Sequence, residues 1–381
     1  MPTTLPLPEP AAAEHSARLT ALIQQEIAAL CGWISFARFM ALALYAPALG
    51  YYTAGSHKLG AAGDFITAPE LSHLFGQTLA RQMVQIMAGS APFVLELGAG
   101  SGKLAADMLA ELDALGSLPE RYYILEVSAD LRARQQERLQ PRWADRVVWL
   151  DSLPDSFSGA IVANEVLDAL PVHLVEWREN GVQERGVAMD EMGFIWQTRD
   201  IADPDLLAAA QAIAAPAPYL SEICLAARGL IHSLATRLQQ GAMLWIDYGF
   251  GAREYYHSQR NSGTLMCHYR HYAHDDPFFL PGLQDLTAHV NFTDIAECGI
   301  DAGLELLGYT NQAFFLINAG ITDLLKNTSP DDVRAYAPLS AQLQKLTSPA
   351  EMGELFKVIA LGKNLTQPLM GFVRGDLSRL L

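Results

Sequence analysis

The chain has 381 residues, half of them hydrophobic, so it can form one large domain with insertions or two domains with sizeable cores. Its 26 basic and 42 acidic side chains give a formal net charge of −16, without a basic cluster. Nucleic-acid binding depends on Lys and Arg contacts to phosphates, so this balance argues against that function. It suits a cationic substrate, such as a protein segment that carries arginine or lysine.

Four scattered cysteines form no Cys-x-x-Cys pair and no zinc spacing, so we expect free thiols and no bound metal. Such cysteine usage favours a reducing compartment, and no secretory signal is visible, so the expected location is cytoplasmic. Residues 28–46 are apolar enough to resemble a membrane span, but Arg38 lies in their middle. A charge at the centre of a bilayer is costly, so we expect a buried helix there and a soluble protein.

Residues 14–90 are expected to form a helical cap that precedes the main domain. Residues 1–13 are rich in Pro and Ala and are predicted to be a disordered tail. Residues 14–46 have the pattern of two short helices. We therefore assign 14–90 to one N-terminal helical segment.

A dense polar stretch lies between residues 50 and 76. Thr67 and Glu70 have the spacing of a capping box, and they predict a helix that runs to about Met87. Asp64 lies in a loop flanked by glycine and is harder to explain by structure alone. Asp64 and Glu70 are therefore candidate catalytic carboxylates, although capping also accounts for Glu70.

An apolar strand at 93–97 runs into three glycines at alternating positions, and a helical pattern follows. This arrangement lets a ligand approach bare backbone at a helix N-terminus. A phosphate loop is excluded, because Leu97 and Leu104 stand where it needs Gly and Ser or Thr. A dinucleotide fingerprint would leave the first glycine without a role. The remaining alternative is Glu-x-Gly-x-Gly-x-Gly, the S-adenosylmethionine (SAM) loop of class I methyltransferases, formed by Glu96, Gly98, Gly100 and Gly102.

Acids end the next two predicted strands. Glu126 follows the apolar run 122–125, where such folds hold a ribose diol by two hydrogen bonds. Asp151 ends the run 147–150 and could meet an adenine amino group, although a plain turn before Pro154 explains it equally well.

A fourth, fully buried strand at 159–163 ends in a polar tip. In doubly wound sheets, ligands bind beyond the carboxyl ends of the strands, and this tip falls there. Asn164 is a candidate cofactor contact and Glu165 a candidate catalytic residue, with Asp168 close behind them.

Residues 172–240 have a different period and predict an insertion. Three antiparallel strands are expected at 173–177, 182–189 and 194–198, followed by helices at 203–214 and 219–240. The chain then returns to the sheet with a buried fifth parallel strand at 242–246, which ends in Asp-Tyr-Gly.

A second dense stretch, 251–292, is predicted to line a substrate cleft. Residues 285–292 alternate strictly, so an extended chain would place Asp285, Thr287, His289 and Asn291 on one face. A solvated edge strand is the plainer explanation of the same pattern. Asp285 and His289 are candidate catalytic residues.

The last part of the chain is expected to complete the sheet. A helix at 293–306, a strand at 312–317 and a strand at 355–361 are consistent with the antiparallel closing strands of methyltransferases. The predicted fold is α/β, a Rossmann-like class I SAM-dependent methyltransferase with a seven-stranded sheet. Its expected parts are a tail at 1–13, a cap at 14–90, a SAM-binding part at 91–171, the insertion at 172–240, and the remaining catalytic domain at 241–381.

With these motifs in view, the chain resembles the MidA-type family, formerly a domain of unknown function, in its bacterial form. The resemblance extends from about Ile34 to Lys363 and rests on the SAM loop and on six further motifs. These are Ser35-Phe36-x-Arg38-Phe39-Met40 with Gly50-Tyr51-Tyr52, Gly63-Asp64-Phe65-x-Thr67-x-Pro69-Glu70, Asn164-Glu165 with Asp168-Ala169-Leu170-Pro171, Asp247-Tyr248-Gly249, Gly263-Thr264-Leu265, and Asp285-x-Thr287-Ala288-His289-Val290-x-Phe292. Members usually carry Asp where this chain has Asn291, which puts an acidic role there in doubt.

The resemblance implies methylation of arginine in a protein by SAM, and a link to respiratory complex I, whose assembly the mitochondrial member assists. Carboxylates that bind a guanidinium can orient one nitrogen and accept its proton. We expect Glu165 in that role, with Asp64, Glu70 or Asp285 as a second carboxylate and His289 as a possible proton acceptor. Two alternatives stay open: a small-molecule methyltransferase with 172–240 and 251–292 as a closed lid, and a non-catalytic assembly factor that binds SAM for stability.

Overall fold

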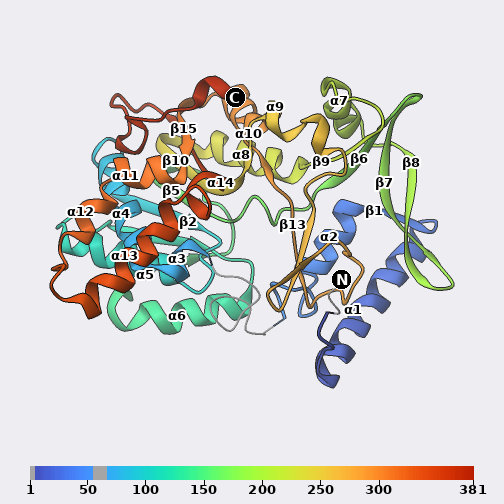
Figure 1. Ribbon diagram of the computed structural model, residues 1–381, viewed down its shortest axis with the longest axis horizontal. Coiled ribbons are helices and arrows are strands. Elements are labelled where there is room, and N and C mark those ends of the chain that lie inside the picture. Colours follow the sequence, from blue (N-terminus) through green and yellow to red (C-terminus); the bar gives the residue numbers. More distant parts are fainter. Residues whose placement is uncertain (1–4, 55–66) are drawn as a thin grey trace. The chain divides into compact units, whose positions relative to one another are not determined.

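The computed structural model describes residues 5–54 and 67–381, so the candidate Asp64 lies outside the described residues. The chain divides into two compact units (Figure 1). Among the described residues, the first unit comprises 5–54, 167–229 and 252–289, and the second comprises 67–166, 230–251 and 290–381. Each unit is built from segments distant in the sequence.

The second unit is built on an eight-stranded mixed sheet. Along the sheet the order is β15 (Glu305–Asn311), β16 (Phe356–Lys363), β10 (Leu238–Phe250), β5 (Phe157–Asn164), β2 (Phe93–Leu97), β3 (Arg121–Leu125) and β4 (Val147–Leu150). Strands β4, β3, β2, β5 and β10 are parallel, whereas β16 is antiparallel to both of its neighbours. The short β14 (Val290–Asn291) pairs with the end of β10. Seven strands in this order, with one reversed, confirm the predicted fold class.

Apolar side chains on one face of this sheet pack against helices. Val94, Val162 and Leu244 belong to one core with residues of α4 (His73–Ala88) and α5 (Lys103–Ala114). The other helical elements that lie wholly in the second unit are α3 (Ala68–Leu71), α6 (Ala129–Trp143), α10 (Phe292–Asp301), α11 (Gln312–Asn318), α12 (Ile321–Leu325), α13 (Val333–Thr347), α14 (Met352–Leu355), η2 (Met370–Phe372) and η3 (Ser378–Leu380). Helix α8 (Leu225–Arg237) belongs partly to each unit.

The first unit combines helices with two antiparallel sheets. One sheet has the order β1 (Trp33–Ser35), β7 (Gly181–Asp190), β6 (His173–Arg178) and β9 (Tyr219–Ile223), with β8 (Gly193–Asp200) also paired to β7. The other has the order β12 (Tyr272–His274), β11 (Met266–Tyr269) and β13 (Asp285–Thr287). Its helices are α1 (Pro10–Ala29), α2 (Phe36–Tyr45), α7 (Pro204–Ala212), α9 (Ala252–Tyr255) and the short η1 (Ser258–Arg260). Buried side chains of α1 and α2, such as Leu19, Ile23 and Phe39, share a core with Leu174 and Val187 of the larger sheet.

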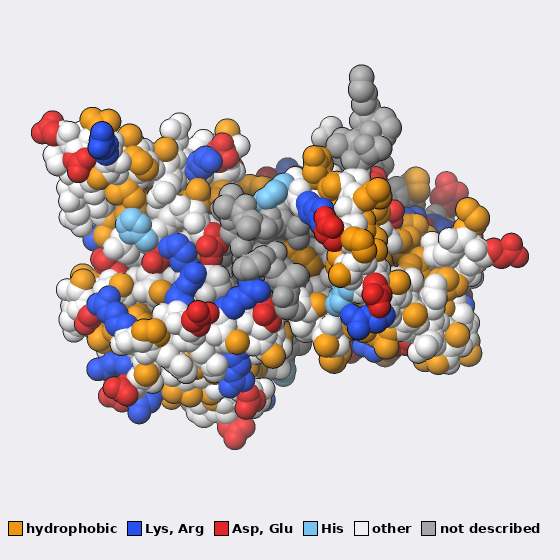
Figure 2. Space-filling view, turned by 90° about the horizontal axis from the view of Figure 1, so that it is seen from below, with side chains coloured by type: hydrophobic (Ala, Val, Ile, Leu, Met, Phe, Trp, Pro, Cys, Tyr) orange, Lys and Arg blue, Asp and Glu red, His pale blue; other side chains and the backbone are white. Residues whose placement is uncertain are grey.

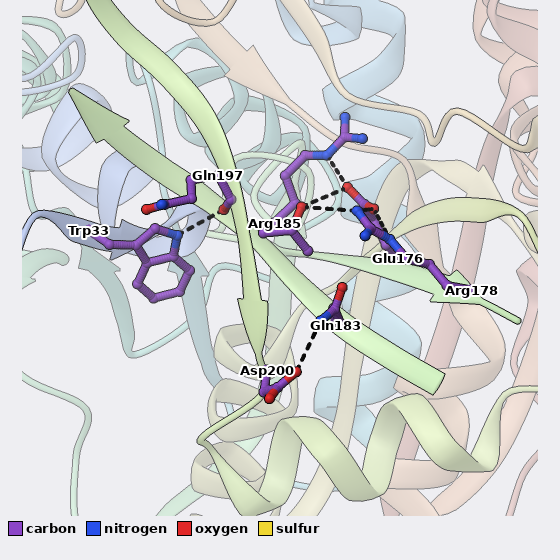
Figure 3. Close-up of polar contacts among 8 residues, drawn as sticks. Trp33, Glu176, Arg178, Gln183, Arg185, Gln197 and Asp200 are labelled. Carbon is purple, nitrogen blue, oxygen red and sulfur yellow. Dashed lines mark hydrogen bonds and ion pairs between the residues drawn. The ribbon is translucent and has the colours of Figure 1, made fainter. Parts of the chain in front are cut away.

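A polar cluster ties three strands of the larger sheet together (Figure 3). Glu176 of β6 accepts hydrogen bonds from Arg178, from Arg185 of β7 and from Thr198 of β8. Burial alone would raise the pKa of Glu176, but the two guanidinium groups lower it below its usual value. The β7–β8 hairpin is further held by Trp33 of β1, whose Nε1 donates to the carbonyl of Gln197 over 2.8 Å.

Several predicted boundaries are wrong. Helix α1 begins at Pro10, so residues 10–13 are helical rather than disordered. The strand expected at 312–317 is helix α11, because Asn311 caps it by accepting from the N–H of Phe314 over 2.9 Å. The preceding β15 supplies the closing strand instead. The helix expected over 219–240 starts only at Leu225, because 219–223 form β9, which pairs with β6.

The predicted capping box at Thr67 is also wrong. The Thr67 side chain makes no capping hydrogen bond, and α3 ends at Leu71. Ser72 has an extended backbone and starts α4 by accepting from the N–H of Leu74 over 3.3 Å. The helix predicted to run to Met87 is therefore two helices, α3 and α4. Helix capping does not account for the presence of Glu70.

Basic, acidic and apolar side chains are interspersed on the face drawn in Figure 2. Among the helices of the described ranges, none is long and apolar enough to cross a membrane. Residues 28–46, where a span could be suspected, are divided among the end of α1, β1 and α2.

Candidate functional site

The glycine loop between β2 and α5 needs glycine for two separate reasons. Gly98, Gly100 and Gly102 have φ values of +63°, +53° and +77°, in the left-handed region that side chains with a Cβ avoid. Space is also short, since a Cβ at Gly98 would lie 2.9 Å from Cγ2 of Val166. A Cβ at Gly102 would lie 3.2 Å from Cα of Gln135. The loop therefore presents bare backbone at the N-terminus of α5.

Glu126, which follows β3, lies against this loop. Its Oε1 accepts from the N–H of Ser128 over 2.9 Å, and its Oε2 accepts from Nε2 of Gln135 over 3.0 Å. Burial raises the pKa of Glu126, although these donors and the backbone N–H groups of Val127 and Gly100 oppose the rise. The carboxylate is thus fixed beside Gly100, where a ribose-binding acid is expected, and that role stays a prediction.

Glu96 lies inside the sheet. The side chain is 2% exposed and accepts from the hydroxyl of Tyr122 over 2.6 Å. Burial raises the pKa of Glu96 to about 7, with a further contribution from the charge of Glu126. A role of Glu96 in cofactor binding stays a prediction.

Asp151 has a different setting. Its side chain follows β4, is 87% exposed and pairs with Arg132 of α6. Arg132 also donates to the carbonyl of Trp149 over 3.3 Å. The adenine contact proposed for Asp151 stays a prediction.

Asn164 and Glu165 form the polar tip of β5. Glu165 has a φ of +53°, rare for a residue with a side chain, and its N–H donates to the carbonyl of Ile246 over 2.9 Å. Nδ2 of Asn164 donates to Oε1 of Glu165 over 3.0 Å. Oδ1 of Asn164 is buried and has no hydrogen-bond partner within residues 5–54 and 67–381. Because Val166 packs at Gly98, this tip lies next to the glycine loop.

The structure also brings Glu70 to the loop. The hydroxyl of Ser101, within the loop, donates to Oε1 of Glu70. The same hydroxyl accepts from Nη1 of Arg138 over 2.8 Å and from the N–H of Lys103 over 3.3 Å. Ser101 was not among the predicted site residues, since a serine within a glycine loop carries no distinctive signal.

The remaining candidates, Asp285 and His289, belong to the first unit. Asp285 is 1% exposed and accepts from the hydroxyl of Tyr52 over 3.0 Å. Burial and the charge of Asp285, with a smaller contribution from Asp168, hold the pKa of Tyr52 well above its usual range. The carbonyl of Asp168 accepts from the N–H of Ala288 over 3.0 Å, so the segment that carries His289 is anchored beside Asp168.

The predicted extended stripe over 285–292 is wrong in its geometry. Strand β13 ends at Thr287, and α10 begins at Phe292. Asp285, Leu286 and Thr287 are 1%, 0% and 4% exposed, so neither face is a solvated strand surface. Asn291 caps α10 by accepting from the N–H of Asp294 over 3.5 Å.

Glu222 of β9 organises this part of the first unit, and the sequence analysis missed it. The side chain is 2% exposed and accepts from the N–H groups of Thr264 and Leu265 over 2.7 and 3.0 Å. It also accepts from the Thr264 hydroxyl over 3.1 Å, and that hydroxyl in turn accepts from the N–H of His289 over 3.0 Å. Glu222 therefore fixes the Gly-Thr-Leu motif and, through it, the backbone at His289. A Cβ at Gly263 would lie 2.3 Å from the Glu222 carboxylate, so this close approach needs glycine, but nothing in the sequence links that glycine to Glu222.

The residues of the second unit fit a SAM-type ligand. The glycines leave the backbone of the loop bare, and Glu126 offers an oriented carboxylate to a diol. The buried, unsatisfied oxygen of Asn164 is a further acceptor at the same end of the sheet. Buried polar atoms in proteins nearly always have partners, so this oxygen can take a hydrogen bond from a ligand or a water at this end of the sheet.

Known proteins support this assignment. The family model described as "Putative S-adenosyl-L-methionine-dependent methyltransferase" matches residues 78–310. The crystal structure of a superfamily member from Burkholderia thailandensis, bound to S-adenosyl-homocysteine, is 50% identical with a TM-score of 0.96, and covers 99% of this chain and 100% of its own. Protein arginine methyltransferase NDUFAF7, mitochondrial, is 31% identical in Danio rerio, with 87% of this chain and 83% of that protein covered. The human protein of the same name is 30% identical, with 87% and 80% covered.

The fold and the matches define a class I methyltransferase. The chain belongs to the family of SAM-dependent methyltransferases whose model it matches, and the predicted MidA-type resemblance is confirmed. The cofactor of this family is S-adenosylmethionine.

Proposed function

We propose that this methyltransferase modifies arginine side chains of a protein, with Glu165 as the carboxylate that binds the guanidinium group. The observation that carries the proposal is the backbone of Glu165, whose φ of +53° is held in place at the carboxyl end of β5. Left-handed backbone at a residue other than glycine costs about 1–3 kcal/mol and is concentrated at functional sites. The same end of an α/β sheet is where ligands bind.

The chemistry needs a carboxylate of this kind. When bound, S-adenosylmethionine supplies an electrophilic methyl group on a sulfonium. A guanidinium is a poor nucleophile because its lone pairs are delocalised. Glu165 would accept two N–H bonds from it, orient one nitrogen toward the methyl group and take the proton that this nitrogen loses. Asn164 Nδ2 already fixes one carboxylate oxygen, which reduces the motion to be lost on substrate binding.

A second carboxylate would complete the binding of the cation. Glu70 is fixed to the glycine loop through Ser101, and Asp285 is buried with Tyr52 as its donor. Asp64 remains a candidate outside the described residues. His289, whose backbone is fixed by Thr264, is the proposed alternative proton acceptor.

The relatives support a protein as the substrate. Proteins about 30% identical to this chain over most of their length are named protein arginine methyltransferases. The family resemblance further suggests a subunit of respiratory complex I or an assembly intermediate as the target. A cytoplasmic location is part of the same proposal.

Labelled SAM tests the proposal directly. The purified chain is incubated with methyl-labelled SAM and a lysate of cells that lack it, and the protein and metabolite fractions are counted separately. We expect label in a protein and, after hydrolysis, in methylated arginine. Label confined to the metabolite fraction would instead identify a small-molecule enzyme, and no transfer at all would favour an assembly factor.

Glu165→Gln then tests the catalytic assignment. Loss of the proton acceptor should slow transfer by ~10²–10⁴-fold while SAM affinity changes only a few fold. Glu297→Gln, the same change at an exposed position of α10, is the matched control and should keep full activity. Wild-type transfer by Glu165→Gln would remove Glu165 from the mechanism.

A further inference from the structure

One buried side chain joins three parts of the cofactor site. Gln135 lies on α6 and is 0% exposed. Its Nε2 donates to the carbonyl of Gly100 over 2.9 Å and to Oε2 of Glu126 over 3.0 Å. Its Oε1 accepts from Nε1 of Trp149, at the end of β4, over 3.1 Å. Both amide hydrogens and the amide oxygen are therefore used.

We infer that Gln135 is the positioning residue of the ribose subsite, which holds the Glu126 carboxylate and the Gly100 backbone in one fixed arrangement. Only a carboxamide can do this, because the site needs two donors and one acceptor in a plane. The inference rests on the proposed role of Glu126 in binding a ribose diol.

The packing leaves Gln135 little freedom. Its Cα would lie 3.2 Å from a Cβ at Gly102, so the backbone of α6 approaches the glycine loop directly. Trp149 fixes the orientation of the amide, since the indole N–H can only donate. With the amide fixed, the Nε2 hydrogens point to Gly100 and Glu126 together. The position of Glu126 is thus set by α6 and β4 as well as by its own strand.

An apolar residue of similar size would break this arrangement. In Gln135→Met, one oxygen of Glu126 and the carbonyl of Gly100 lose their donor inside a buried region. A carboxylate that loses a donor can turn toward the remaining N–H groups of Ser128 and Val127. It would then no longer present its oxygens to a diol in a fixed direction.

Comparing two ligands separates this role from general stability. Affinities of S-adenosylhomocysteine and of its 2′-deoxy analogue are measured by titration calorimetry for each variant. In the unmodified chain the missing hydroxyl should weaken binding by about 10- to 100-fold, as for one hydrogen bond to a charged group. In Gln135→Met we expect the ratio of the two affinities to fall by about tenfold, because only the ligand with the diol loses a hydrogen bond to Glu126. A ratio unchanged from the wild type, even with weaker binding of both ligands, would overturn the inference.

Two further variants make the result specific. Gln82→Met removes another fully buried carboxamide, which bonds to Gln85 and Gly371 instead, and it should keep the wild-type ratio. Glu126→Ala should abolish the difference in affinity between S-adenosylhomocysteine and its 2′-deoxy analogue. If Glu126→Ala keeps the ratio, the ribose assignment itself is wrong. If Glu126→Ala loses the ratio but Gln135→Met keeps it, only the role of Gln135 is refuted.

A milder change covers the case in which Gln135→Met does not fold. Trp149→Phe removes only the donor to Oε1, so the amide can rotate away from Glu126. The ratio should then fall, although by less than in a chain without the amide. A full wild-type ratio in Trp149→Phe would show that the orientation of Gln135 does not matter, which contradicts the inference.

Discussion

Replacing Glu96 by Gln should change how the stability of the protein depends on pH. The carboxyl group is buried in β2, and burial raises its pKa from 4.5 to about 7. Between these two values the folded chain keeps a proton that the unfolded chain has released. The contribution of Glu96 to the free energy of unfolding therefore falls as pH rises from 4.5 through 7 and is constant beyond. The interval between a pKa of 4.5 and one of about 7 corresponds to ~3 kcal/mol.

The neighbouring Tyr122 stays protonated over this range, since burial and the charge of Glu96 hold its pKa well above 10. Gln at position 96 can still accept the Tyr122 hydrogen but cannot ionise. We expect Glu96→Gln to gain ~3 kcal/mol relative to the wild type between pH 5 and pH 8. Urea unfolding at four pH values, followed by tryptophan fluorescence, measures this change.

Exposed Glu297→Gln controls for the loss of one surface charge. If wild type and Glu96→Gln differ by the same free energy at pH 5 and pH 8, the buried carboxyl does not titrate as argued. The assay needs no cofactor, so its outcome is independent of the methyl-transfer proposal.

Two other substitutions test the glycine loop and the family motif. Gly98→Val should abolish binding of S-adenosylhomocysteine in a titration, because φ is +63° and a Cβ would lie 2.9 Å from Cγ2 of Val166; wild-type affinity would contradict the loop assignment. Asn291→Asp should preserve activity and change the free energy of unfolding by less than about 0.5 kcal/mol, because both residues cap helices equally well. A large change in the rate of transfer would show that position 291 acts beyond capping.

The parallel strands were predictable because their signal is local. The run 159–163 is continuously apolar, as a strand buried on both faces must be, and 93–97 is apolar except for the buried Glu96. Each run is followed by glycine or polar residues. The alternating glycines pointed to the loop for a local reason as well, since their positive φ values restrict which residues can stand there.

The predicted secondary structure was wrong where contacts with other elements decide between strand and helix. Residues 312–317 are mostly apolar and residues 219–223 mix apolar with polar side chains, and neither pattern decides between strand and helix. Residues 219–223 became a strand because β6 offers them an edge, and 312–317 a helix because Asn311 caps it. Residues 285–291 alternate in type, yet Asp285 and Thr287 on the polar face are as buried as Leu286 and Ala288 on the other. Pattern alone gives no information about what covers the second face.

The same distinction explains which site residues were found. Glu126, Asn164 and Glu165 stand where a strand ends, so their place in the sequence already implies a place in the site. Gln135 stands within Arg-Ala-Arg-Gln-Gln-Glu-Arg, the sequence of an exposed helix, and Glu222 lies in a segment assigned to a helix. Their importance comes from burial among donors and acceptors of other elements, which no local pattern records.

The glycine motif and Gln135 nevertheless depend on each other. A residue with a Cβ at 102 would push α6 away by its contact with the Cα of Gln135. A shift of α6 by a few tenths of an ångström would change the distances from the Gln135 amide to Gly100, Glu126 and Trp149. The third glycine of the loop is therefore needed for the approach of a neighbouring helix as well as for its own φ of +77°. If so, Gly102→Ala should lower cofactor affinity through Glu126, even though the loop would still expose its backbone.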